Sequence, residues 1–120
     1  MRPYTGPWAG WWEQEGYGRQ PMQGIVMSFD GRVLRGRGAD LAGPFEMNGT
    51  SENGEVAIVK QYPMHQVAYA GRWNGEGAIL GEWWFPDVPQ ERHVEGITRG
   101  RFSLWPERLP GADAPIEDIR

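Results

Sequence analysis

The chain has 120 residues, which is the size of one domain with a single hydrophobic core and too short for two domains. It has no cysteine, which excludes disulfides and thiolate metal sites, and its net charge of −4 gives no general attraction for a phosphate backbone, so we expect no nucleic-acid partner. Seven Trp, four Tyr and four Phe supply the apolar area of a core, so the 18 Gly and 10 Pro are expected to punctuate strands rather than to mark disorder.

Two sequence features bear on location, a secretory signal and a membrane-spanning stretch. Residues 1–4 lack the apolar run of a secretory signal, and no stretch reaches the roughly 18 to 20 apolar residues that span a bilayer. We therefore expect a cytoplasmic protein with no membrane partner.

Apolar residues alternate with small or polar ones at period two along nearly the whole chain, which predicts strands. The eight predicted strands cover, in chain order, residues 8–14, 22–29, 33–38, 43–49, 55–62, 65–73, 78–85 and 100–105. The dipeptides Asp-Gly at 30–31 and Asn-Gly at 74–75 are expected to form type I′ hairpin turns, because both accept positive φ at the two central positions. Residues 53–54 and 62–64 connect two further adjacent pairs, so each strand is expected to neighbour the next.

The edges of such a meander favour closure. Eight strands without covering helices would expose two edge strands, and pairing the first strand with the last removes both edges. We therefore predict an all-β fold, an eight-stranded antiparallel up-and-down (meander) barrel in residues 1–106, followed by an extended or partly helical tail in residues 107–120. A flattened sandwich of the same strands is the alternative, because the sequence does not measure the shear of the sheet.

One side of every predicted strand carries large apolar residues interleaved with glycine, and we assign this side to the interior of the barrel. The rings expected to converge there on one centre are Trp8, Trp12, Phe45, Tyr69, Trp83 and Phe102. Whether these rings fill the lumen or leave room for one small molecule stays open, because eight strands enclose either.

Polar residues on the inward side are the candidates for function, because a buried polar group costs free energy unless it is satisfied. Most of them come from the hairpin at residues 60–69 and should gather at one mouth of the barrel, where they could orient a small polar or anionic ligand among tryptophan faces. The predicted ligand-binding residues are Lys60, Tyr62, His65, Tyr69, Trp12, Trp73, Trp83 and Asp40. A structural role, in which Asp40 pairs with Lys60 to plug the mouth, is the equal alternative. Residues 86–98, the longest connection, are a candidate lid over this site.

The outward side is polar on the middle strands but apolar where the seventh, eighth and first strands would meet. The predicted interface residues there are Trp11, Leu80, Trp84 and Trp105, with Met22 and Val26 following on the second strand. Such a patch predicts a partner, most simply a second copy of the chain, so we expect a homo-oligomer. In one alternative the tail folds over the patch. In the other, the tryptophans of the patch stack against sugar rings.

No catalytic residues, metal or cofactor are predicted. The two histidines, His65 and His93, do not have metal-ligand spacing, and no nucleophile has a neighbouring base. The first hypothesis is a non-enzymatic barrel that binds a small molecule in its mouth or lumen. The second is an interaction or structural module that uses the outer tryptophans, and the third is a cyclase- or isomerase-type enzyme in which His65 or Tyr69 acts as acid or base.

Residues 6–8 (Gly-Pro-Trp), with Trp12 and Gln14, and glycine-x-aromatic strand endings at 81–83 and 100–102 resemble those of the avidin and streptavidin barrels, and more loosely of lipocalin-type barrels. The likeness is one of architecture and extends over most of residues 6–106. It implies a ligand that enters one open end and oligomers that form through the outer walls. The Ser, Thr and Asp positions with which avidin-like proteins contact their ligand have no clear counterpart here, so biotin binding is not implied.

Overall fold

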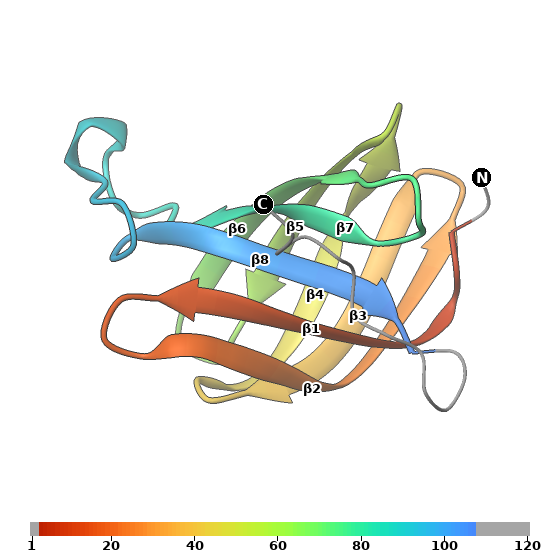
Figure 1. Cartoon of the computed structure of the whole chain (residues 1–120), viewed down its shortest axis with the longest axis horizontal. Coiled ribbons are helices and arrows are strands. Elements are labelled where there is room, and N and C mark those ends of the chain that lie inside the picture. The colour runs from red at the N-terminus through yellow and green to blue at the C-terminus, as the bar shows by residue number, and fades with distance from the viewer. Residues whose placement is uncertain (1–2, 108–120) are drawn as a thin grey trace.

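The computed structural model describes residues 3–107 and shows a closed barrel of eight antiparallel strands in meander order (Figure 1). The strands are β1 (Gly6–Gln14), β2 (Gly18–Asp30), β3 (Val33–Asp40), β4 (Gly43–Glu52), β5 (Glu55–Gln61), β6 (Gln66–Trp73), β7 (Ile79–Trp84) and β8 (Arg99–Pro106). Each strand pairs with the next, and β8 pairs with β1 from Trp8↔Pro106 to Trp12↔Phe102, which closes the sheet. The predicted fold class, an all-β eight-stranded meander barrel, is confirmed in place of the alternative flattened sandwich.

Helical structure is nearly absent from this part of the chain. Over residues 3–107 the single helical element is the short 3₁₀ turn η1 (Gln90–Arg92), in the connection between β7 and β8. No helix in that range has the length and apolar character needed to cross a bilayer. The prediction for the tail falls, apart from Glu107, outside the described residues.

The tight turns differ in type from the expectation. Type I′ geometry, with positive φ at both central residues, occurs at Asn53 (φ 55°) and Gly54 (φ 80°) between β4 and β5. Between β2 and β3 the two loop residues are Gly31 and Arg32, and only Gly31 has a positive φ (59°), which is the pattern of a type II′ turn. The loop after β6 is longer, and the Asn74 side chain holds it by accepting hydrogen bonds from two backbone N–H groups of the loop.

A β-bulge in β2 changes which of its residues point inward. Trp8 of β1 pairs with Ile25, whereas Gly10 pairs with Met22, so β2 contributes one extra residue. Gly24 lies in the bulge with φ of 62°, a conformation that glycine adopts without strain. Because the bulge shifts the alternation by one residue, Met22 is buried in the core and only 4% exposed. The expectation that Met22 joins the outward patch is therefore wrong.

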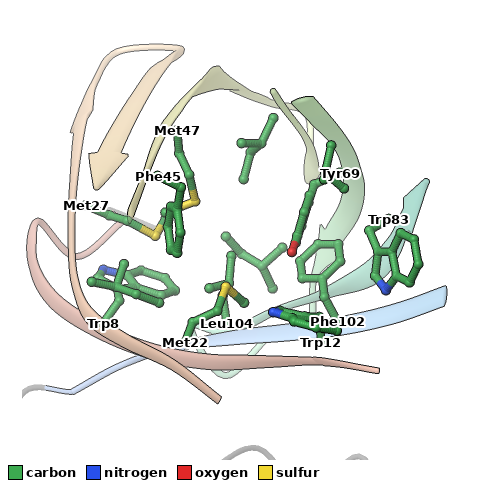
Figure 2. Close-up of a cluster of buried hydrophobic side chains, with 14 of the residues drawn as sticks. Trp8, Trp12, Met22, Met27, Phe45, Met47, Tyr69, Trp83, Phe102 and Leu104 are labelled. Carbon is green, nitrogen blue, oxygen red and sulfur yellow. The ribbon is translucent and has the colours of Figure 1, made fainter. Parts of the chain in front are cut away.

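The inward side chains form one core cluster (Figure 2). All six rings that were expected to converge belong to it, namely Trp8, Trp12, Phe45, Tyr69, Trp83 and Phe102. At the end of the barrel where β2 meets β3 and β6 meets β7, the ring centroid of Trp8 lies 5.9 Å from that of Phe29 and 6.1 Å from that of Trp73. Aromatic rings thus pack that end of the lumen.

Candidate functional site at one mouth of the barrel

The opposite end of the barrel holds a pocket of about 200 Å³, which we call the mouth pocket. It lies where β1 meets β2, β3 meets β4, β5 meets β6 and β7 meets β8. Its lining residues are Trp12, Gln14, Tyr17, Leu41, Ala42, Tyr62, His65, Val67, Tyr69, Trp83 and Phe85. Since an apolar cavity of roughly 150 Å³ holds benzene, this volume accommodates a ring with a short substituent. The lumen is therefore packed at one end and open at the other.

Behind the pocket wall lies Lys60, the only lysine in the chain, whose side chain has no exposed surface. Its ammonium nitrogen Nζ lies 2.7 Å from Oδ2 of Asp40. Nζ also donates to the hydroxyl of Tyr69 at 3.0 Å and to Sδ of Met22 at 3.4 Å. The ring centroid of Phe45 is 4.2 Å from Nζ, which adds a cation–π contact. Each N–H group of the ammonium therefore has a partner although water is excluded.

Asp40, the last residue of β3, compensates this cation, and its side chain also has no exposed surface. Besides the Lys60 ammonium, its Oδ2 accepts hydrogen bonds from the hydroxyl of Tyr62 at 2.6 Å and from the indole N–H of Trp12 at 3.1 Å. Its Oδ1 accepts a hydrogen bond from the backbone N–H of Ala42 at 2.9 Å, which fixes the turn into β4. Four donors thus replace the hydration of the carboxylate.

Burial sets the protonation states of this network. Loss of water lowers the pKa of Lys60 to about 8, although the neighbouring Asp40 charge opposes the shift. Burial raises the pKa of Tyr62, and its hydrogen bond to Asp40 raises it further. The pKa of Tyr69 lies well above its ordinary value, first because the phenol is buried and second because the Asp40 charge is near. At neutral pH the Lys60 side chain is therefore an ammonium paired with Asp40, and both phenols are neutral.

The structure brings together most of the residues predicted from the sequence. The buried network contains Asp40, Lys60, Tyr62, Tyr69 and Trp12. Two further predicted residues lie at the pocket: His65 is exposed at its rim, stacked on Tyr62 with 4.5 Å between ring centroids, and Trp83 lines its wall. Trp73 is separate, because it packs at the other end of the barrel, where its indole N–H donates to the Ser51 hydroxyl at 2.9 Å.

Several residues of the site were not anticipated. Met22 reaches Lys60 because of the bulge in β2, which alternation alone does not reveal. Leu41 and Ala42 line the pocket from the turn between β3 and β4, and Tyr17 lines it from the turn between β1 and β2. Turn residues have no inward or outward phase, so their side chains could not be assigned from periodicity.

The connection between β7 and β8 was expected to act as a lid, but residues 86–98 do not line the mouth pocket. The loop extends away from the barrel (Figure 1) and is fastened to the end of β1 and the turn that follows it. The side-chain amide of Gln14 donates to the carbonyl oxygen of Ile97 at 2.7 Å, and the backbone N–H of Glu15 donates to that of Gly96 at 2.7 Å. These bonds support the rim of the pocket from its side.

The outward residues lie on adjacent strands, as expected, because β1 and β7 both flank β8. Trp11 and Leu80 are each paired with Ser103, so they lie on either side of it. Trp11 is only 7% exposed, and the guanidinium of Arg19 lies 3.6 Å from its ring centroid. The other three residues of the patch, Leu80, Trp84 and Trp105, are half-buried. The alternative in which the tail covers this patch lies outside the described residues.

Fold and site together define a closed eight-stranded antiparallel β-barrel with an aromatic pocket at one end and a buried ion pair behind its wall. Comparisons of the chain with protein-family models, with curated proteins and with solved structures found no match. The likeness to avidin and lipocalin-type barrels is therefore one of strand number and order. Within residues 3–107, no group of three or more His, Asp and Glu side chains is arranged to hold a metal ion.

Proposed function

We propose that this barrel binds a small organic molecule in the mouth pocket without catalysing a reaction on it. The observation that carries the proposal is that an aromatic pocket is backed by a fully buried Lys60–Asp40 pair. Replacing a buried ion pair by apolar side chains is often neutral or stabilising, so stability alone does not account for the pair. It does fix the positions of Trp12, Tyr62 and Tyr69 in the pocket wall, and a pre-positioned wall reduces the cost of binding.

Binding without catalysis fits the chemistry of the pocket. Both buried phenols have raised pKa values, which disfavours the release of a proton at neutral pH and makes them poor general bases. His65, the lining imidazole, is exposed at the rim and stacked on Tyr62 rather than placed against the buried network.

A substitution that fills the pocket tests the proposal. Ala42 lines the pocket and is exposed, and it is hydrogen-bonded to the network through its backbone N–H. Ala42→Trp should therefore occupy the pocket and leave the network intact. Ala57→Trp is the matched control, because Ala57 is exposed on β5 and does not line the mouth pocket. ¹⁵N-labelled protein would be screened by NMR against small aromatic and aliphatic compounds.

We expect binders to shift the indole N–H signals of Trp12 and Trp83. These shifts should be lost in Ala42→Trp and retained in Ala57→Trp. The proposal fails if no compound shifts these signals, or if the filled variant responds like the wild type.

The outward patch supports a second function, self-association through the outer wall of the barrel. Leu80, Trp84 and Trp105 place three large, half-buried apolar side chains on the adjacent strands β7 and β8, and such patches mark interaction surfaces. Resemblance to the avidin barrels implies the same pair of features, a ligand at one open end and oligomers through the walls. The two functions use different faces and do not exclude each other.

A further inference from the structure

We infer that the ligand of the mouth pocket is an uncharged aromatic molecule with a carbonyl-type hydrogen-bond acceptor, and that the hydroxyl of Tyr69 donates to this acceptor. The inference rests on the proposed function and adds the chemical class of the ligand. It follows from a count of the protons in the pocket wall and from the position of the charges.

Three of the four buried polar aromatic side chains of the pocket wall have no proton left for a ligand. Each carries a single polar hydrogen. The indole N–H of Trp12 and the hydroxyl of Tyr62 both donate to Asp40, at 3.1 Å and 2.6 Å. The indole N–H of Trp83 donates to the backbone carbonyl oxygen of Glu13 at 3.0 Å. These groups can offer a ligand their ring faces but no donor.

Tyr69 is the exception. Its side chain is 3% exposed, and its oxygen accepts a hydrogen bond from Lys60 at 3.0 Å. Among residues 3–107 its own hydroxyl proton has no acceptor. A buried donor without an acceptor is unfavourable, so a ligand oxygen that accepts this proton is stabilised there. The contact with the ammonium polarises the O–H bond and makes it a stronger donor.

The charges of the site favour an uncharged ligand. The sequence left open whether the ligand is polar or anionic. The Lys60 ammonium is compensated by Asp40, and neither residue lines the pocket. The lining side chains include no carboxylate and no ammonium, and the one imidazole, that of His65, lies at the exposed rim. A charged ligand would lose its hydration without gaining a buried counter-ion. The remaining wall is dominated by ring faces and aliphatic groups such as Val67, which suit an aromatic ring.

Four probes that share one ring separate these features: acetophenone is neutral with a carbonyl, benzoate is anionic, benzylammonium is cationic and toluene has no acceptor. Dissociation constants would be measured by NMR titration of the full chain at pH 7. We expect acetophenone to bind most tightly and toluene about tenfold more weakly, since one net hydrogen bond contributes a factor of this order. Benzoate and benzylammonium should bind more weakly than toluene.

Tyr69→Phe removes the donor and keeps the ring. In this variant the affinity for acetophenone should fall to that for toluene, whereas the affinity for toluene should not change. Tyr17→Phe is the matched control, because it removes the hydroxyl of an exposed lining residue and should leave the ratio of the two affinities unchanged.

The ranking of the probes in the wild type tests the inference even if Tyr69→Phe does not fold. Tightest binding of benzoate or benzylammonium, equal binding of acetophenone and toluene, or no binding by any probe overturns it. If the probes bind to the wild type with the wrong ranking and their binding is lost in Ala42→Trp, the inference fails while the proposed function stands. If no probe and no compound of the screen binds, both fail.

Discussion

The ammonium of Lys60 lies 2.7 Å from Oδ2 of Asp40, and neither side chain has any exposed surface. The two residues belong to β5 and β3, which are not neighbours in the sheet because β4 lies between them. The pair therefore forms inside the lumen and not along the wall. Each charge depends on the other, because an isolated charge at this depth would lose most of its hydration energy without a compensating interaction.

Removal of the cation alone should be costly. Lys60→Met leaves the Asp40 carboxylate buried without a counter-ion, and we expect a loss of about 3 to 5 kcal/mol in the free energy of unfolding. The double variant Asp40→Asn/Lys60→Met removes both charges and should recover part of this loss. Urea denaturation of the wild type, Asp40→Asn, Lys60→Met and the double variant measures the coupling between the two side chains. Additive effects of the two substitutions would contradict the proposed dependence.

An exposed pair provides the control for this experiment. Arg32 and Glu52 also form an ion pair, at 2.9 Å, but both side chains are at least half exposed. Water already solvates such charges, so Arg32→Met is expected to change the stability little. A loss as large as that of Lys60→Met would show that the effect does not come from burial.

The protonation of Lys60 should be visible directly, because the chain has no other lysine. Lysine labelled with ¹³C at Cε gives a single side-chain signal, whose titration we expect to report a pKa of about 8. Between this value and the ordinary pKa of about 10.4, the unfolded chain keeps a proton that the folded chain has released. The contribution of Lys60 to the free energy of unfolding should therefore rise with pH across this window and be constant below pH 8.

The two buried phenols should lower the free energy of unfolding at higher pH, in contrast to Lys60. Because their pKa values are raised in the folded state, the unfolded chain loses these protons first, above about pH 10, and stability should fall there. The free energy of unfolding, measured by urea denaturation from pH 7 to 11, should thus show a maximum.

For Lys60, a Cε signal that titrates near pH 10.4 would mean that burial does not disfavour its charge.

Much of this fold could be predicted from the sequence because two-residue periodicity and the turns indicate the strands and their order, and the removal of two exposed edges favours closure. The eight strands and the convergence of six rings follow from alternation, which the pleated backbone imposes. Met22 could not be assigned in this way, since a single extra residue in β2 reverses the phase on one side of the bulge.

The candidate site shows a related limit. Alternation assigns a side chain to the inside of the barrel but does not give its depth along the barrel axis. Trp73 is inward like Trp83, yet the two lie at opposite ends of the lumen, because Trp73 ends β6 beside the turn into β7, whereas Trp83 lies near the far end of β7. The hairpin that places Lys60, Tyr62 and Tyr69 near one another was predictable, because a tight turn fixes the register of the residues beside it.

Glycine in the sheet should be irreplaceable where two backbones meet. A Cβ atom on Gly81 would overlap the carbonyl oxygen of Ala70 and backbone atoms of Gly71, which cannot move without separating β6 from β7. At Gly36 the nearest atoms, all at 3.0 Å, are Cε of Met47, Cγ of Met27 and the carbonyl oxygen of Val26, and the two flexible methionine side chains can shift more easily than paired backbone. Gly81→Ala is therefore expected to cost about 3 kcal/mol or more and Gly36→Ala clearly less, as measured by urea denaturation. Equal losses would contradict this distinction.

The outward patch predicts that the chain self-associates. Sedimentation velocity of the wild type should show a concentration-dependent dimer, since half-buried Leu80, Trp84 and Trp105 would be further removed from water at a shared interface. Leu80→Glu places a charge in the centre of this surface and should shift the protein to monomer. Val59→Glu, on the exposed outer face of β5, adds the same charge and should leave the dimer intact. A wild type that stays monomeric at the highest concentration, or a dimer that persists in Leu80→Glu, would exclude this wall as the interface, because a carboxylate buried there without a partner is not tolerated.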